Sequence, residues 1–183
     1  MQVTEFVTRY PRLYHMAEKG TWPAIRQRGL LSTTALLDRH EIVGPERHQL
    51  ECEHRPEKVP LGSYGNQVVL RDQKPMPPER LMRALPNGVS PSQWYQLLNG
   101  KVFMWAEEER LLRLLNATHY KALEHDVLTI DTASMVAAYE PSMWLCHMNS
   151  GNTFPMPTPR DIDIQAHCRL SDELEEEGRG SGR

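Results

Sequence analysis

The chain has 183 residues, of which 39% are hydrophobic and 25% are charged. These proportions are close to the average for globular proteins, so they favour one folded domain with a sizeable core and exclude a largely disordered chain. The formal net charge of −3 argues against binding of nucleic acid through bulk positive charge, although it is compatible with a local basic groove.

The cysteines and the start of the chain indicate the cellular compartment in which we expect the protein. Cys52, Cys146 and Cys168 form no CxxC pair and are odd in number, which favours a reducing compartment over a disulfide scaffold. The chain does not begin with a basic segment followed by an apolar run, and no stretch approaches the ~18 apolar residues that a spanning helix needs. We therefore expect a cytoplasmic protein with no membrane partner.

Short strands and helices alternate in the first half of the sequence. Apolar and β-branched residues mark the strands, and proline, serine and glycine mark the helix ends, with Gly29 placed to end a helix that starts near Pro23. Arg71 stands at the exit of the second strand. The expected elements are strands over 12–16 and 67–71 and helices over 21–29, 32–37 and 45–54.

The second half continues this alternation. A proline opens each of two helices, Asn99-Gly100 ends the second of them, and leucines line one side of a later charged helix. The expected elements are helices over 77–85, 91–98, 106–115 and 132–139 and strands over 101–105, 126–131 and 142–148. An irregular stretch follows, and residues 171–183 read as a disordered acidic and glycine-rich tail behind a single domain over 1–170.

Several common signatures are missing, and no metal site is expected. The sequence has no P-loop, no dinucleotide-binding GxGxxG, no GxSxG and no HExxH motif. His40, His48 and His54 lie near several glutamates and Cys52, but their spacing matches no familiar ligand pattern. A solvated helix face explains this cluster better than a metal site does.

The opening of the chain carries a resemblance to a known superfamily. Leu13-Tyr14-His15, followed by Ile25-x-x-x-Gly29-Leu30 and Ser32, resembles the start of ADP-ribosyltransferases, particularly the DarT-type DNA ADP-ribosyltransferases and the tRNA 2′-phosphotransferases. Later pieces are also similar to an uncharacterised bacterial domain family with the same opening. These pieces are Leu70-Arg71-Asp72-Gln73, Val102-Phe103-Met104-Trp105 and Asn149-Ser150-Gly151.

This resemblance implies an α+β fold in which two small, mostly antiparallel sheets surround a cleft and helices pack outside. It also implies NAD as the substrate and DNA, RNA or protein as the acceptor. Cleavage of the nicotinamide–ribose bond needs donors to ribose and pyrophosphate, an aromatic surface and a carboxylate. The expected catalytic residues are Arg71 and Glu140. The expected NAD-binding residues are His15, Tyr14, Tyr64, Trp105, Asn149, Ser150 and Gly151. We expect His15, Tyr64, Arg71, Trp105 and the loop from Asn149 to Thr153 to face one pocket, with Glu140 as its acid.

Other interpretations of these residues stay open. His15 fits equally well as a half-buried residue that bonds a backbone carbonyl, and Arg71-Asp72 fits a local ion pair. Phe103 and Trp105 also fit a core, and the 149–152 stretch a plain turn. Because Glu140 precedes Pro141 in an expected loop, a module that binds the nucleotide without cleaving it, or a 2′-phosphotransferase-like activity, are the alternatives. The sequence does not indicate an oligomeric state.

Overall fold

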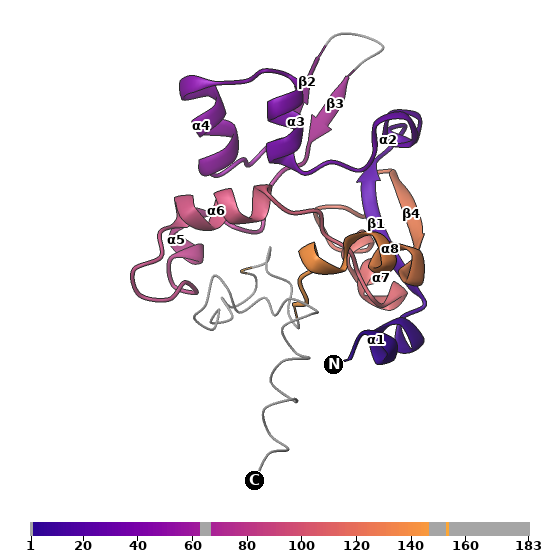
Figure 1. The fold of residues 1–183 in the computed structure, drawn as a ribbon. Coiled ribbons are helices and arrows are strands. Elements are labelled where there is room, and N and C mark those ends of the chain that lie inside the picture. Colours follow the sequence, from indigo (N-terminus) through magenta and orange to yellow (C-terminus); the bar gives the residue numbers. More distant parts are fainter. Residues whose placement is uncertain (1, 63–66, 147–152, 154–183) are drawn as a thin grey trace. The chain divides into compact units, whose positions relative to one another are not determined.

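The computed structural model describes residues 2–62, 67–146 and 153. These residues form eight α-helices, one short 3-10 helix and two separate two-stranded antiparallel sheets (Figure 1). The expected α+β class and the small antiparallel sheets are confirmed. The chain divides into two compact units. Among the described residues, the first unit comprises 2–19 and 103–146, and the second comprises 20–62, 67–102 and 153.

The first unit contains one sheet and four helical segments. Its elements are α1 (Val3–Arg9), β1 (Arg12–Glu18), α7 (Glu108–Leu115), β4 (His125–Asp131), α8 (Thr132–Tyr139) and the 3-10 helix η1 (Glu140–Ser142). β1 pairs with β4 in antiparallel register, with Leu13 opposite Ile130 and His15 opposite Leu128. Because side chains alternate along a strand, Leu13 and Ala17 reach the interior from one face of β1. The core of the unit forms where Leu13 meets Phe6 of α1 and Val136 of α8.

The second unit contains five helices and the other sheet. Its elements are α2 (Trp22–Arg28), α3 (Thr33–Arg39), α4 (Gly44–Cys52), β2 (Val59–Leu61), β3 (Val68–Leu70), α5 (Pro78–Leu81) and α6 (Pro91–Asn99). One apolar cluster joins α3, α4 and the two strands through Leu37, Leu50, Leu61 and Leu70. A second cluster joins α5 and α6 around Trp94 and Tyr95.

Helix ends in the second unit follow the signals in the sequence. Gly29 ends α2 with a φ of 86°, a conformation that glycine adopts without strain, so its predicted role is confirmed. The Ser32 hydroxyl accepts the Ala35 N–H at the start of α3. Ser90 and Gln93 cap α6 reciprocally. The helix predicted over 77–85 is shorter than expected, because α5 ends at Leu81 and turns follow it.

Two predicted strands are wrong. Within residues 101–105, Trp105 forms an isolated bridge with Tyr14 of β1. Phe103 and its other neighbours form no ladder with that strand. The strand predicted over 142–148 does not form in its described part. Pro141 favours helical backbone there, and the chain continues from α8 into η1. Residues 147 and 148 lie outside the described residues.

Two elements were not predicted from the sequence. α1 covers residues that carried no helix prediction, and β2 contains Pro60, which obscures a strand pattern because proline cannot donate to a ladder. None of the helices in the described part combines the length and the apolar character needed to cross a bilayer.

Candidate functional site

His15 is held at its Nδ1 atom by a backbone carbonyl. It lies half-buried in the middle of β1, on the same side of the strand as Leu13 and Ala17. Its Nδ1 lies 2.8 Å from the carbonyl oxygen of Phe103. A carbonyl only accepts, so Nδ1 donates in this contact, and in the neutral form of the ring Nε2 is then the acceptor nitrogen. The ring is therefore oriented by its own unit, as the carbonyl-bonded interpretation expected.

Tyr14 and Trp105 are brought together on the other side of β1. Their backbones exchange two hydrogen bonds, of 2.9 Å from the Tyr14 N–H and 2.8 Å from the Trp105 N–H. Directly opposed residues of an antiparallel pair point to the same face, whereas consecutive residues of a strand point to opposite faces. The pairing thus associates Trp105 with Tyr14 rather than with the face that carries His15. The predicted pocket that would contain both His15 and Trp105 stays a prediction.

Glu140 lies at a helix end. It is half-buried and begins η1 directly after α8, and its carbonyl accepts the Met143 N–H at 3.1 Å. In the superfamily that the opening of the chain resembles, the usual acid is a late glutamate on or near a strand, and the position of Glu140 in η1 departs from that pattern. The catalytic role of Glu140 stays a prediction.

Arg71 follows β3 in the second unit. It is half-buried, and its carbonyl accepts a hydrogen bond of 2.8 Å from Nε of Arg55. Two residues later, Gln73 is buried and exchanges backbone and side-chain hydrogen bonds with the same arginine. Arg55 thus holds the segment directly after β3 through both backbone and side-chain hydrogen bonds.

The remaining predicted NAD-binding residues, Tyr64, Asn149, Ser150 and Gly151, lie outside the described residues, and so does the tail over 171–183. Thr153, at the end of the same predicted loop, is described and fully buried. Its N–H and its hydroxyl both donate to the Pro75 carbonyl, at 3.1 and 2.6 Å. This pair of bonds attaches the end of that segment to the second unit.

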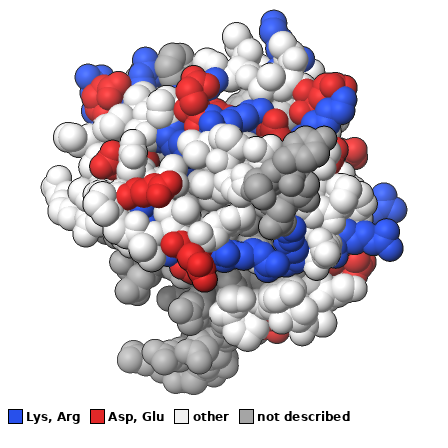
Figure 2. All heavy atoms as spheres, turned by 90° about the horizontal axis from the view of Figure 1, so that it is seen from above, with Lys and Arg blue, Asp and Glu red and all other residues white. Residues whose placement is uncertain are grey.

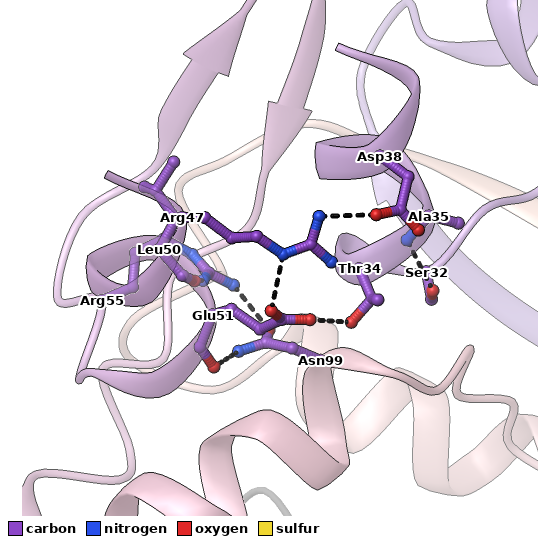
Figure 3. A network of polar contacts seen from close by, with 9 residues as sticks. All are labelled: Ser32, Thr34, Ala35, Asp38, Arg47, Leu50, Glu51, Arg55 and Asn99. Carbon is purple, nitrogen blue, oxygen red and sulfur yellow. Dashed lines mark hydrogen bonds and ion pairs between the residues drawn. The ribbon is translucent and has the colours of Figure 1, made fainter. Parts of the chain in front are cut away.

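The second unit contains a buried polar network that was not predicted from the sequence (Figure 3). Arg55 is 6% exposed, and its guanidinium donates to Leu50 O at 2.5 Å, to Arg71 O and to Asn99 Oδ1 at 3.1 Å. Nδ2 of Asn99 donates to the Glu51 carbonyl at 2.8 Å. The network links α4, the chain after β3 and the last residue of α6.

Glu51 extends this network toward α3. Its carboxylate accepts from the Thr34 hydroxyl at 2.5 Å and from Arg47 Nε at 3.0 Å, and Arg47 also donates to Asp38. These two carboxylates hold the pKa of Arg47 above its usual value through their hydrogen bonds. The solvated helix face predicted for this part of the chain is wrong at Glu51, which is 6% exposed. No signal in the sequence distinguishes this glutamate from its exposed neighbours.

Burial weakens proton binding by Arg55. Removal of the guanidinium from water lowers its pKa to about 10, while the charge of Asp72 opposes this shift. The side chain still carries its charge at neutral pH. Its hydrogen-bond partners are carbonyl and amide oxygens rather than a carboxylate, so hydrogen bonding rather than a contact ion pair offsets much of the desolvation cost.

Neither a metal cluster nor a uniformly charged surface emerges. Within the described ranges, no three His, Cys, Asp or Glu side chains are grouped so that they could hold a metal ion. On the face shown in Figure 2, the basic side chains lie among acidic ones. This mixture agrees with the small net charge of the chain.

Comparison with known proteins places the chain in a family. The model of a family of unknown function, DUF7002, matches residues 11–178. The chain belongs to this family. Neither the curated proteins nor the solved structures include a significant match. The matched range includes β1, the Arg55 network and the residues for which NAD binding is predicted.

Proposed function

We propose that the protein binds NAD and transfers ADP-ribose to a nucleic-acid or protein acceptor. The proposal builds on the orientation of His15, a strand residue whose Nδ1 is engaged by the Phe103 carbonyl. This contact is expected of a structural histidine, and it also fixes the ring. A ring held in this way has a defined tautomer and direction, which a ligand-binding histidine requires. The resemblance supplies the ligand, because it assigns this histidine to the ribose of NAD.

The chemistry divides into three tasks. In its neutral form, His15 accepts a hydrogen bond from a ribose hydroxyl at Nε2. Arg71 binds a phosphate oxygen pair through its planar guanidinium, a geometry that lysine does not provide. Glu140 supplies the carboxylate that stabilises the positive charge on the ribose or activates the acceptor. Tyr14, Tyr64, Trp105 and the Asn149, Ser150 and Gly151 stretch contribute ring stacking and amide donors in this proposal.

The first test is NAD binding measured by calorimetry with two variants of His15 and one control variant at another histidine. His15→Asn keeps a donor near the position of Nδ1 and lacks the second ring nitrogen, His15→Ala removes both, and His119→Ala is the matched control. His119 is exposed and belongs to the same unit. We expect both His15 variants to weaken NAD binding by about tenfold, and the control to bind normally.

The second test is transfer of label from NAD to DNA, RNA and lysate protein, with Glu140→Gln and Arg71→Ala as variants. We expect labelled acceptor from the wild-type protein and a loss of labelling in both variants while the proteins stay folded. Absence of NAD binding by the wild-type chain would refute the proposal.

A second candidate function is a module that binds NAD without cleaving it. The position of Glu140 in η1, rather than on a strand, favours this alternative. Normal NAD binding without label transfer or NAD hydrolysis would select it. In that case, Glu140→Gln would leave NAD binding unchanged.

A further inference from the structure

We propose that Arg55 is the positioning residue for Arg71. This inference rests on the proposed function, in which Arg71 binds the phosphates of NAD. Arg55 itself is buried and engages protein atoms with all three nitrogens of its guanidinium. It therefore acts on a ligand through the segment that it holds, not by contact.

The contacts of Arg55 converge on the chain just after β3. Its Nε donates to the Arg71 carbonyl at 2.8 Å, and its own N–H donates to Oε1 of Gln73 at 3.1 Å. In return, the Gln73 N–H donates to the Arg55 carbonyl at 2.6 Å. Three hydrogen bonds between one residue and a three-residue segment restrict the backbone dihedrals that aim the Arg71 side chain.

The rest of the network anchors Arg55. Its other two guanidinium nitrogens donate to Leu50 O at the end of α4 and to Asn99 Oδ1 at the end of α6. Next to it, the His54 ring lies 3.0 Å from the Gln73 carbonyl and stacks on Tyr95 at 6.1 Å. Two helices thus determine where the guanidinium sits, and the guanidinium determines where the segment after β3 sits.

The choice of residue type supports a positioning role. A buried guanidinium costs desolvation free energy, and an apolar side chain of similar size would fill the space without that cost. Arginine offers a fixed planar fork that reaches three acceptors on different elements at once, which neither lysine nor methionine can do. A chain that keeps this arrangement gains a defined geometry after β3.

The test compares Arg55→Lys with Leu81→Ala, a control that disturbs the core of the same unit at a fully buried residue of α5. The first readout is hydrogen exchange of the Gln73 amide, whose N–H donates to the Arg55 carbonyl. We expect Arg55→Lys to accelerate this exchange on the order of tenfold beyond the effect of its change in global stability. In the Leu81→Ala control, the exchange rate of the Gln73 amide should change only as much as the global stability of that variant does. Unchanged Gln73 exchange in Arg55→Lys would refute the proposal.

The second readout is the affinity for NAD in a double-mutant cycle. Action through Arg71 predicts that Arg55→Lys weakens NAD binding about tenfold in the wild-type background and has little further effect once Arg71 is alanine. Equal effects in both backgrounds would indicate a general structural role and refute the proposal. If Arg55→Lys does not fold, Gln73→Met replaces it, because it removes the acceptor of the Arg55 N–H together with the long contact of 3.5 Å from Gln73 Nε2 to Asn99 Oδ1.

These readouts separate the two proposals. Failure of the wild-type chain to bind NAD refutes the proposed function, and the link from Arg55 to NAD falls with it. Accelerated Gln73 exchange would then still support the ordering of the 71–73 segment by Arg55. Normal NAD binding that depends on Arg71 but not on Arg55 leaves the proposed function intact and refutes the positioning role.

Discussion

The interior of the first unit is built from apolar contacts around Phe6, Leu13 and Val136, whereas the second unit buries charged and amide side chains beside its leucine clusters. Among the described residues, the first unit buries the polar Thr132, whose hydroxyl donates to the Tyr10 carbonyl. The second buries Glu51, Arg55, Gln73, Asn99 and Thr153.

The two interiors differ in how tightly they specify the positions of their side chains. Apolar contacts are non-directional and tolerate repacking, whereas each buried hydrogen bond requires a partner at a set distance and angle. We therefore expect the first unit to accept conservative substitutions in its core and the second unit to reject them at the polar network. The segment after β3 lies in the unit where geometry is the more tightly specified.

The largest effect is expected from Arg55→Met. Methionine fills a similar volume but removes the guanidinium donor from the Leu50 and Arg71 carbonyls, and it leaves Asn99 Oδ1 with the longer contact of 3.5 Å from Gln73 Nε2. Relief of the desolvation cost offsets part of this loss, and we expect the free energy of unfolding to fall by about 4 kcal/mol. Urea denaturation of both proteins measures this change in the free energy of unfolding. A change below about 1 kcal/mol would mean that the network is dispensable for stability.

A somewhat smaller effect is expected from Leu13→Ala in the first unit. Leu13 is 4% exposed, and its truncation leaves a cavity beside Phe6 and Val136. We expect a loss of about 3 kcal/mol in the same urea measurement, and less than about 1.5 kcal/mol for Leu13→Met, which conserves volume. If Leu13→Met costs as much as Leu13→Ala, the first unit is as intolerant as the second and the comparison fails.

This contrast also explains which parts of the fold could be predicted. Strand β1, the glycine that ends α2 and the proline start of α6 follow from local patterns, and each was predicted. Trp105 shows where local pattern is insufficient. Its alternating apolar neighbours look like a strand, but whether they form a ladder depends on a partner edge roughly 90 residues away.

The candidate site was predictable to a smaller extent. His15 was identified with two interpretations, and its carbonyl partner Phe103 is 88 residues away in the chain, so the sequence could not reveal that contact. Arg55 carried no signal, because hydrophobic periodicity reports apolar burial and treats every polar residue as solvated. Its partner Asn99 was interpreted only as a helix stop. The NAD-binding roles of these regions stay predictions.

A moderate effect is expected from Tyr95→Phe in the second unit. The Tyr95 hydroxyl is buried and donates to the Met76 carbonyl at 2.6 Å. Burial raises the pKa of this hydroxyl above its usual value, and the charge of Glu79 adds to the shift. At neutral pH, we expect the substitution to lower the free energy of unfolding by about 1 kcal/mol.

The pH dependence of that difference has a definite sign. The unfolded chain loses the tyrosine proton near pH 10, whereas the folded chain retains it, so the unfolded state gains stability above that pH. The advantage of wild type over Tyr95→Phe should shrink by about 1.4 kcal/mol per pH unit above 10. Arg55, whose pKa is lowered to about 10, shifts stability the opposite way but is present in both proteins and cancels. A constant difference up to pH 11 would contradict a buried, hydrogen-bonded hydroxyl at Tyr95.

The smallest effect is expected from an exposed ion pair of the first unit, between Lys19 and Glu124. Their side chains are 56% and 75% exposed, so water and salt screen the attraction and immobilising both side chains costs entropy. A double-mutant cycle with alanine at both positions should give a coupling below about 0.5 kcal/mol that vanishes at high salt. The matched pair in the second unit is Arg47 with Glu51, whose side chain is 8% exposed. There we expect a larger coupling that persists at high salt, because Glu51 also accepts from Thr34 and is shielded from solvent. Equal couplings in the two cycles would show that charge pairs, unlike the hydrogen bonds of Arg55, do not distinguish the two units.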